Sequence, residues 1–277
     1  MAAVHVLLAV AVLADPGRPP PDPCRAAAAP LPRPAELPRD AARAVDAYRA
    51  AWRGACEPKA TPDVAALLGD AEVLAADARK SRAVRAIAAA AAERGGEWPL
   101  PGIRLVDGEL AVDWGAFAPF GARGKVDDVR FWRGAAIAAD GSGGPAWLEH
   151  APDAPGGACV RLGTARWRDV VRALDDMEAT RAAQYAGRAR TLRDELVETL
   201  AGIGRGPVVC GCLRADPTTG LHALAALDAP EGPDAPAQPA VAEAARAALD
   251  AVQSGRVKVR WLRDAPGAEP TGCGAAP

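Results

Sequence analysis

Apolar residues recur at intervals of three and four over the first third of the chain, which predicts a helical hairpin at residues 36–96. Its first helix covers residues 36–54 and its second covers residues 62–94. Thr61 is a suitable N-cap for the second helix, because Pro62 at the next position favours the first turn. Two long amphipathic helices joined by a short turn would pack antiparallel.

The pattern then changes from helical to alternating, which predicts a small antiparallel sheet with long loops between residues 97 and 163. Its clearest part is a hairpin, because Asp107-Gly108 is a dipeptide favoured by type I′ turns and alternating apolar residues lie on either side of it. Further strands are expected at residues 126–133, 135–139, 146–150 and 158–162.

Helical spacing returns at Thr164 and continues to about Leu200, which predicts one long helix. A second hairpin follows, with strands at residues 208–213 and 221–227. A helix at 240–253 and a strand at 257–262 complete a C-terminal ββαβ unit. The chain as a whole is therefore predicted to be α+β.

The N-terminus resembles a signal peptide in its pattern, because the short apolar run of residues 4–13 ends in small residues. Such a run is well below the roughly 20 residues that cross a bilayer as a helix. No Lys or Arg precedes it, so an alanine-rich N-terminus of a cytosolic protein is the alternative. Cleavage before Asp15 would leave a mature chain that is exported to the periplasm or secreted, with no membrane span.

The complete predicted organisation has six segments. They are a signal peptide (1–14), a Pro-rich disordered leader (15–35), a helical hairpin (36–96), a sheet plus long helix (97–204), a ββαβ unit (205–264) and a loose tail (265–277).

The cysteines agree with export, because their number is even and all of them follow the predicted cleavage site. They predict disulfide bonds rather than a zinc site, since no two closely spaced pairs are present. Cys24 and Cys56 bracket the first helix and are expected to bond to each other. Cys210 and Cys212 would either form a thiol-exchange pair or each bond to a different partner, such as Cys159 and Cys273.

The formal net charge of −2 argues against nucleic-acid binding, and no cofactor or metal is expected. Aromatic residues concentrate between residues 97 and 163, where they either fill the core or stack on sugar rings. Trp98 and Trp147 are the expected exposed members. Arg256, Lys258 and Arg260 alternate with apolar residues, so they either meet an anionic envelope polymer or protect a sheet edge.

Catalytic motifs are incomplete. The segment 140–145 resembles the active-site hexapeptide of chymotrypsin-like serine proteases, but Asp and Gly are transposed and the only upstream histidine is His5. Glu149-His150 and scattered aspartates do not define an acid/base pair. The sequence therefore favours a non-catalytic envelope protein that binds a glycan or another protein, with a periplasmic hydrolase or a thiol-disulfide exchange enzyme as the alternative.

Overall fold

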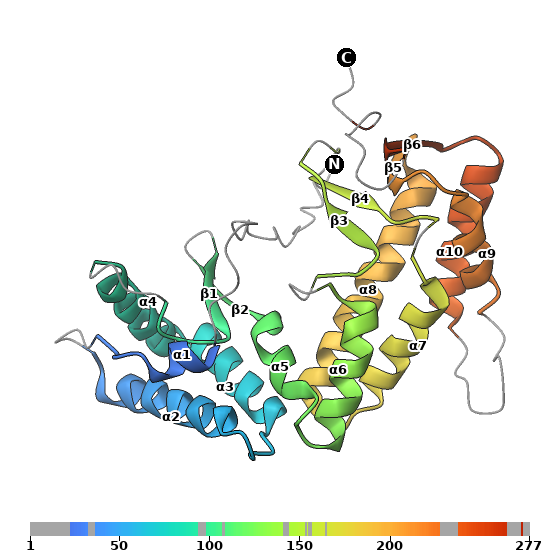
Figure 1. Cartoon of the computed structure of the whole chain (residues 1–277). Helices are drawn as coiled ribbons and strands as arrows, with labels where there is room; N and C mark the ends of the chain where they lie inside the picture. The colour runs from blue at the N-terminus through green and yellow to red at the C-terminus, as the bar shows by residue number, and fades with distance from the viewer. Residues whose placement is uncertain are drawn as a thin grey trace. The chain divides into compact units, whose positions relative to one another are not determined.

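The computed structural model describes residues 23–32, 37–93, 98–106, 109–140, 144–152, 154, 157–163, 165–227, 238–264 and 273. It is a mixture of helices and strands, which confirms the predicted α+β class. The chain divides into two compact units, residues 1–125 (unit 1) and 126–277 (unit 2), which are described separately (Figure 1). The predicted signal peptide lies outside the described residues, as does the predicted loose tail except for Cys273.

Unit 1 combines helices with one hairpin, and the expected two helices are in fact three. The predicted second helix is interrupted at Asp77, whose carboxylate accepts hydrogen bonds from the backbone of Arg79 and Lys80 and so caps a new helix. Its first part begins after Asp63, which serves as the N-cap instead of Thr61. The elements are α1 (Pro23–Ala28), α2 (Arg39–Cys56), α3 (Val64–Ala76), α4 (Ala78–Glu93), β1 (Ile103–Val106), β2 (Glu109–Val112), the 3-10 helix η1 (Trp114–Phe117) and α5 (Ala118–Gly121).

The core of unit 1 forms around Trp52 of α2, which has no exposed surface. The rings of Phe117 and Phe120 both lie 5.1 Å from its ring, centre to centre. Gly102 lies at the entry to the confirmed hairpin with a φ of 73°, and a Cβ there would lie 2.6 Å from the ring of Phe117. Only glycine combines this backbone conformation with so close an approach.

Part of the predicted disordered leader is ordered, because a disulfide and arginine hydrogen bonds hold it against α2. The Cys24–Cys56 disulfide joins α1 to the last residue of α2, as expected from the sequence. The buried Arg49 donates to the carbonyl oxygens of residues 26, 27 and 29 at the end of α1. The last turn of a helix leaves its C=O groups without partners inside the helix, and Arg49 supplies donors for them. Arg53 of α2 also donates to the carbonyl oxygen of Ala27, 3.3 Å away.

Unit 2 contains a four-stranded sheet and a layer of helices. The strand order is β3-β4-β5-β6; β3 is antiparallel to β4, whereas β4, β5 and β6 are mutually parallel. Figure 1 shows the helices side by side, with the strands gathered toward one end of them. The elements are α6 (Val126–Ala138), β3 (Leu148–His150), β4 (Ala158–Val160), α7 (Trp167–Glu178), α8 (Ala183–Arg205), β5 (Val208–Leu213), α9 (Pro217–Ala225), α10 (Pro239–Gln253) and β6 (Lys258–Arg263).

The parallel strands are joined by helical crossovers, which corrects the predicted ββαβ unit. The expected strand at residues 221–227 is largely helix α9, so the connection from β5 to β6 is two helices. Asp216 accepts a hydrogen bond from the backbone of Thr218, and Pro217 occupies the first helical position. This segment is therefore a helix start and not the hairpin turn that its Asp-Pro and Gly residues also suit.

The strands predicted at residues 126–133 and 135–139 are also wrong, because this segment is helix α6. Its buried positions Asp128, Phe131 and Ala138 recur at helical spacing. Gly134 lets α6 approach α7 closely, since a Cβ there would lie 2.6 Å from the Cγ atom of Met177. The short apolar run fits either period locally, and packing against α7 decides between them.

The predicted single helix from residue 164 to 200 is two helices, α7 and α8. The buried Thr180 lies in the break, where its hydroxyl donates to the carbonyl oxygen of Met177, 2.7 Å away. The hydroxyl thereby adds a side-chain hydrogen bond to a carbonyl at the end of α7 that also accepts from the backbone N–H of Thr180. The break lets α7 and α8 pack against each other instead of forming one extended rod.

A polar network ties the helices of unit 2 together. Arg193 of α8 donates to Asp175 at 2.7 Å, to Glu178 at 3.1 Å and to Gln238, and Gln238 donates to Asp175 at 2.7 Å. Burial raises the pKa of Asp175, and the hydrogen bond from Arg193 opposes this rise. The arginine thus compensates for a carboxylate that is largely removed from water.

We expect Arg193→Ala to lower the free energy of unfolding by about 2 kcal/mol, because it leaves partly buried acceptors unpaired. The loss should be greatest at neutral pH and shrink on acidification, since protonation of Asp175 removes its need for a cation. Urea unfolding at several pH values measures both effects. Arg205→Ala is the matched control on the same helix, because its pair with Glu198 is mostly exposed and should contribute less than about 0.5 kcal/mol. Equal effects of the two variants would contradict this prediction.

Candidate functional site

A pocket of about 570 Å³ in unit 2 lies at the carboxyl ends of the three parallel strands. Arg161 directly follows β4, Leu213 ends β5 and Arg263 ends β6, and all three line the pocket. Ligands of open sheets with parallel strands bind at this edge, where the loops leave the strands. The volume is typical of a site for a small molecule.

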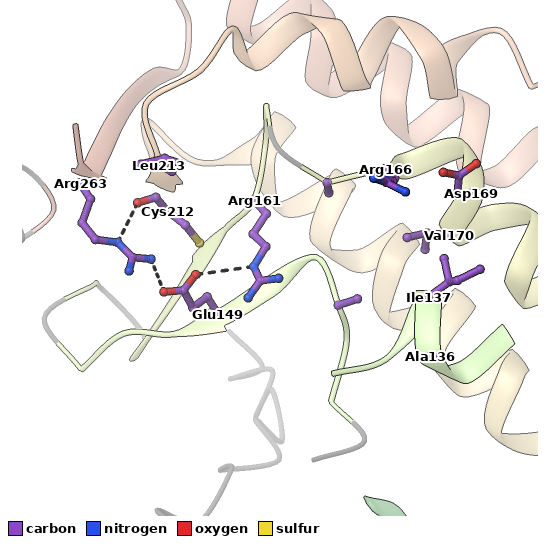
Figure 2. A pocket seen from close by; sticks show the side chains of 12 residues that line it. Ala136, Ile137, Glu149, Arg161, Arg166, Asp169, Val170, Cys212, Leu213 and Arg263 are labelled. Atoms are coloured by element: carbon purple, nitrogen blue, oxygen red, sulfur yellow. Dashed lines mark hydrogen bonds and ion pairs between the residues drawn. The ribbon is translucent and has the colours of Figure 1, made fainter. Parts of the chain in front are cut away.

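Glu149 of β3 lies on one side of the pocket between two of its arginines (Figure 2). One carboxylate oxygen pairs with Arg263, and the other lies 3.6 Å from the Nε atom of Arg161. Arg263 also donates to the carbonyl oxygen of Cys212, 3.5 Å away. All three charged side chains retain exposed surface, between 27% for Arg263 and 41% for Arg161, so the two ion pairs of Glu149 are open to water.

A disulfide backs this side of the pocket. Cys159 of β4 lies opposite Glu149 in the β3–β4 register and bonds to Cys212 of β5. A carboxylate oxygen of Glu149 and both sulfur atoms lie within 4.8 Å of one another. Cysteine binds a metal ion as a thiolate, and these two sulfur atoms are bonded to each other, so in this form the three residues do not make a metal site.

The other side of the pocket is formed by the start of α7 and the end of α6 (Figure 2). Arg166 is the N-cap residue of α7 and is exposed, while Asp169 lies in the first turn. Ile137 and Val170 add apolar surface. The free N–H groups of a helix N-terminus carry partial positive charge, which adds to that of the neighbouring arginine. The pocket therefore offers three guanidinium groups, two carboxylates and a small apolar area.

The tryptophans singled out in the sequence do not lie in this pocket. Trp147 has no exposed surface, and its indole N–H donates to the hydroxyl of Thr199 on α8, 3.2 Å away. The expected exposure of Trp147 is therefore wrong, because the ring packs against α8. Trp98 of unit 1 is partly exposed, and its indole N–H donates to the carbonyl oxygen of Leu100 at 2.7 Å. The structure does not bring the two rings together in one unit.

The predicted basic residues lie on or beside β6, which is an edge strand of the sheet. Arg256 pairs with Asp250 of α10 at 2.6 Å, whereas Lys258 and Arg260 are exposed. None of the three lines the pocket, but Arg263 at the end of the same strand does. Sequence reasoning found the strand and missed this residue, although its place at the carboxyl end of a predicted strand was a usable signal.

All six cysteines are paired, which confirms the prediction of disulfides. Cys210 bonds to Cys273 and Cys212 to Cys159, so the two neighbouring cysteines of β5 have different partners. Three disulfides are typical of a chain that folds outside the cytoplasm. Within the ranges that the structure describes, no helix is long and apolar enough to span a membrane.

Comparisons of the chain with protein-family models, with curated proteins and with solved structures find no match.

Proposed function

We propose that this chain is a periplasmic or secreted protein of a Gram-negative-type envelope that binds a glycan without catalysing a reaction. The observation that carries the proposal is the pocket at the carboxyl ends of β4, β5 and β6, which is backed by the Cys159–Cys212 disulfide. Loops that leave parallel strands form ligand sites in many folds, and the disulfide holds two of these strands together. The signal-peptide pattern of residues 4–13 supports export.

Two features of the site favour binding over catalysis. Both oxygens of Glu149 are engaged by arginines, so neither is free to exchange a proton with a substrate while these pairs are formed. A thiol-exchange enzyme would need Cys210 and Cys212 as a pair, and each has another partner. A pocket that presents charged groups from several strands is suited to recognition.

The proposal is tested by expressing the full chain in a Gram-negative host and recovering it from the periplasm. Its intact mass should correspond to a chain that begins at Asp15 and lacks six hydrogens, about 6 Da, for three disulfides. A full-length, reduced chain confined to the cytoplasm would contradict export. The recovered protein is then mixed with purified peptidoglycan sacculi from the same host and sedimented.

We expect the protein to sediment with the sacculi and to release no soluble fragments from them. Ala136→Trp, which places a large ring at an exposed position in the pocket wall, should abolish sedimentation. Ala247→Trp adds the same ring at an exposed position of α10 outside the pocket and should leave it unchanged. Protein that stays in the supernatant would overturn glycan binding, and release of fragments would overturn the non-catalytic role.

A further inference from the structure

We infer that the pocket binds a sugar carrying an oxyanion, either a carboxylate or a phosphate, and that Glu149 is an internal competitor for that oxyanion. The inference rests on the proposed function, because it assumes that this pocket is where the glycan binds. It extends the proposed function in two ways: it gives the ligand a negative charge, and it names Glu149 as a residue of the protein that weakens binding.

The arrangement around Glu149 shows that two arginines are spaced to hold one carboxylate. They come from different strands, Arg161 after β4 and Arg263 at the end of β6, and each faces a different oxygen of the same group. Guanidinium groups recognise carboxylate and phosphate through the same planar set of N–H donors. Because these side chains are partly exposed, a ligand oxyanion can reach the arginines and exchange with Glu149.

A third arginine is available without displacing anything. Within the part of the chain that the structure describes, the Arg166 guanidinium forms no ion pair or hydrogen bond. It lies at the N-terminus of α7, and three arginines against Glu149 and Asp169 leave an excess of positive charge. An oxyanion is therefore favoured over a cation in this pocket.

The remaining carboxylate indicates what else the ligand contains. Asp169 lies on the same side of the pocket as Arg166, and a carboxylate there can only accept hydrogen bonds (Figure 2). A bare anion would be repelled by it, whereas a sugar offers hydroxyl donors beside its acidic group. A hydroxylated oxyanion satisfies both kinds of charge in the pocket.

The test is isothermal titration calorimetry of the chain recovered from the periplasm, at low salt, with glucuronate, glucosyl phosphate, inorganic phosphate and glucose. We expect one or both acidic sugars to bind more tightly than glucose and inorganic phosphate, and the acidic sugar that binds identifies the source of the oxyanion. The affinity should fall as salt is added, because the interaction is between partly exposed charges.

Three variants test the roles of the residues. Glu149→Gln keeps the shape of the side chain and removes its charge, so it should increase the affinity about tenfold by freeing Arg161 and Arg263. Arg166→Gln should decrease the affinity about tenfold. Lys258→Gln is the matched control, because it removes an exposed positive charge outside the pocket and should leave the affinity unchanged. Impaired folding cannot produce the gain expected for Glu149→Gln.

The results separate this inference from the proposed function. If glucose binds as tightly as the acidic sugars, or if Glu149→Gln fails to increase the affinity, the inference is overturned and glycan binding stands. Equal affinity for inorganic phosphate and glucosyl phosphate, without binding of glucuronate, would overturn the requirement for a sugar. Sedimentation with sacculi that needs the pocket, combined with no binding of any acidic probe, would also overturn the inference. Loss of both sedimentation and probe binding would overturn the proposed function itself.

Discussion

Replacing both Cys159 and Cys212 with alanine should lower the free energy of unfolding by about 4 kcal/mol, because this disulfide closes a loop between residues 53 positions apart. Both sulfur atoms are also in residues with almost no exposed surface, so the shorter side chains leave unfilled space. Urea unfolding without reductant measures the loss. Since the disulfide lies behind Glu149 and joins two strands of the pocket, binding of the acidic sugar should weaken as well.

The matched control is the double replacement of Cys24 and Cys56 with alanine. Their disulfide joins residues 32 positions apart in unit 1. This replacement should cost a similar amount of stability, about 4 kcal/mol, and leave sugar binding unchanged. Full stability of the Cys159/Cys212 variant would show that the sheet does not depend on this bond. Equal losses of binding in both double variants would contradict a local role at the pocket.

Trp167→Ala should lower the free energy of unfolding by about 4 kcal/mol, because it removes a large buried side chain at the start of α7 and leaves a cavity. The indole N–H of Trp167 donates to the carbonyl oxygen of Leu162 at 3.0 Å. Its ring packs on Gly220 of α9, where a Cβ would lie only 2.2 Å from the ring. The residue therefore fixes the beginning of the helix that follows Arg166, and thermal or urea unfolding measures its contribution.

A double-mutant cycle tests whether the contact with the ring of Trp167 is the reason that position 220 requires glycine. Gly220→Ala in the wild-type chain should cost about 2 kcal/mol, because the added methyl group meets the ring of Trp167. In the Trp167→Ala background the same change should cost close to nothing, since the ring is gone and alanine favours a helix over glycine. Additive costs would show that Gly220 is required for a different reason.

Several elements could be predicted from the sequence because their signals are local. The helices α2 and α10 and the hairpin β1–β2 each have an apolar face of one clear period, and their ends carry ordinary helix or turn residues. The strands β5 and β6 were predicted for the same reason. The Cys24–Cys56 bond also followed from position, because both cysteines flank one predicted helix.

The errors arose where a short segment fits two periods. Residues 126–138 and 217–225 are short segments in which few apolar positions repeat, so their helical spacing is weak in the sequence. The close approaches at Gly134 and Gly220 show what decides the outcome, because each allows one helix to pack tightly on another. Such contacts form between segments far apart in the chain and leave no local pattern.

By itself the sequence determined the α+β class, the presence of disulfides and the lack of a complete catalytic motif, because composition and short-range periodicity carry those properties. The pocket was decided by the tertiary structure alone. Glu149 and Arg263 are 114 positions apart. They meet because β3 pairs antiparallel with β4 and because parallel pairing of β4, β5 and β6 brings the ends of those strands to one edge. Strand order depends on how the crossover helices pack, and that packing energy is a property of the folded chain.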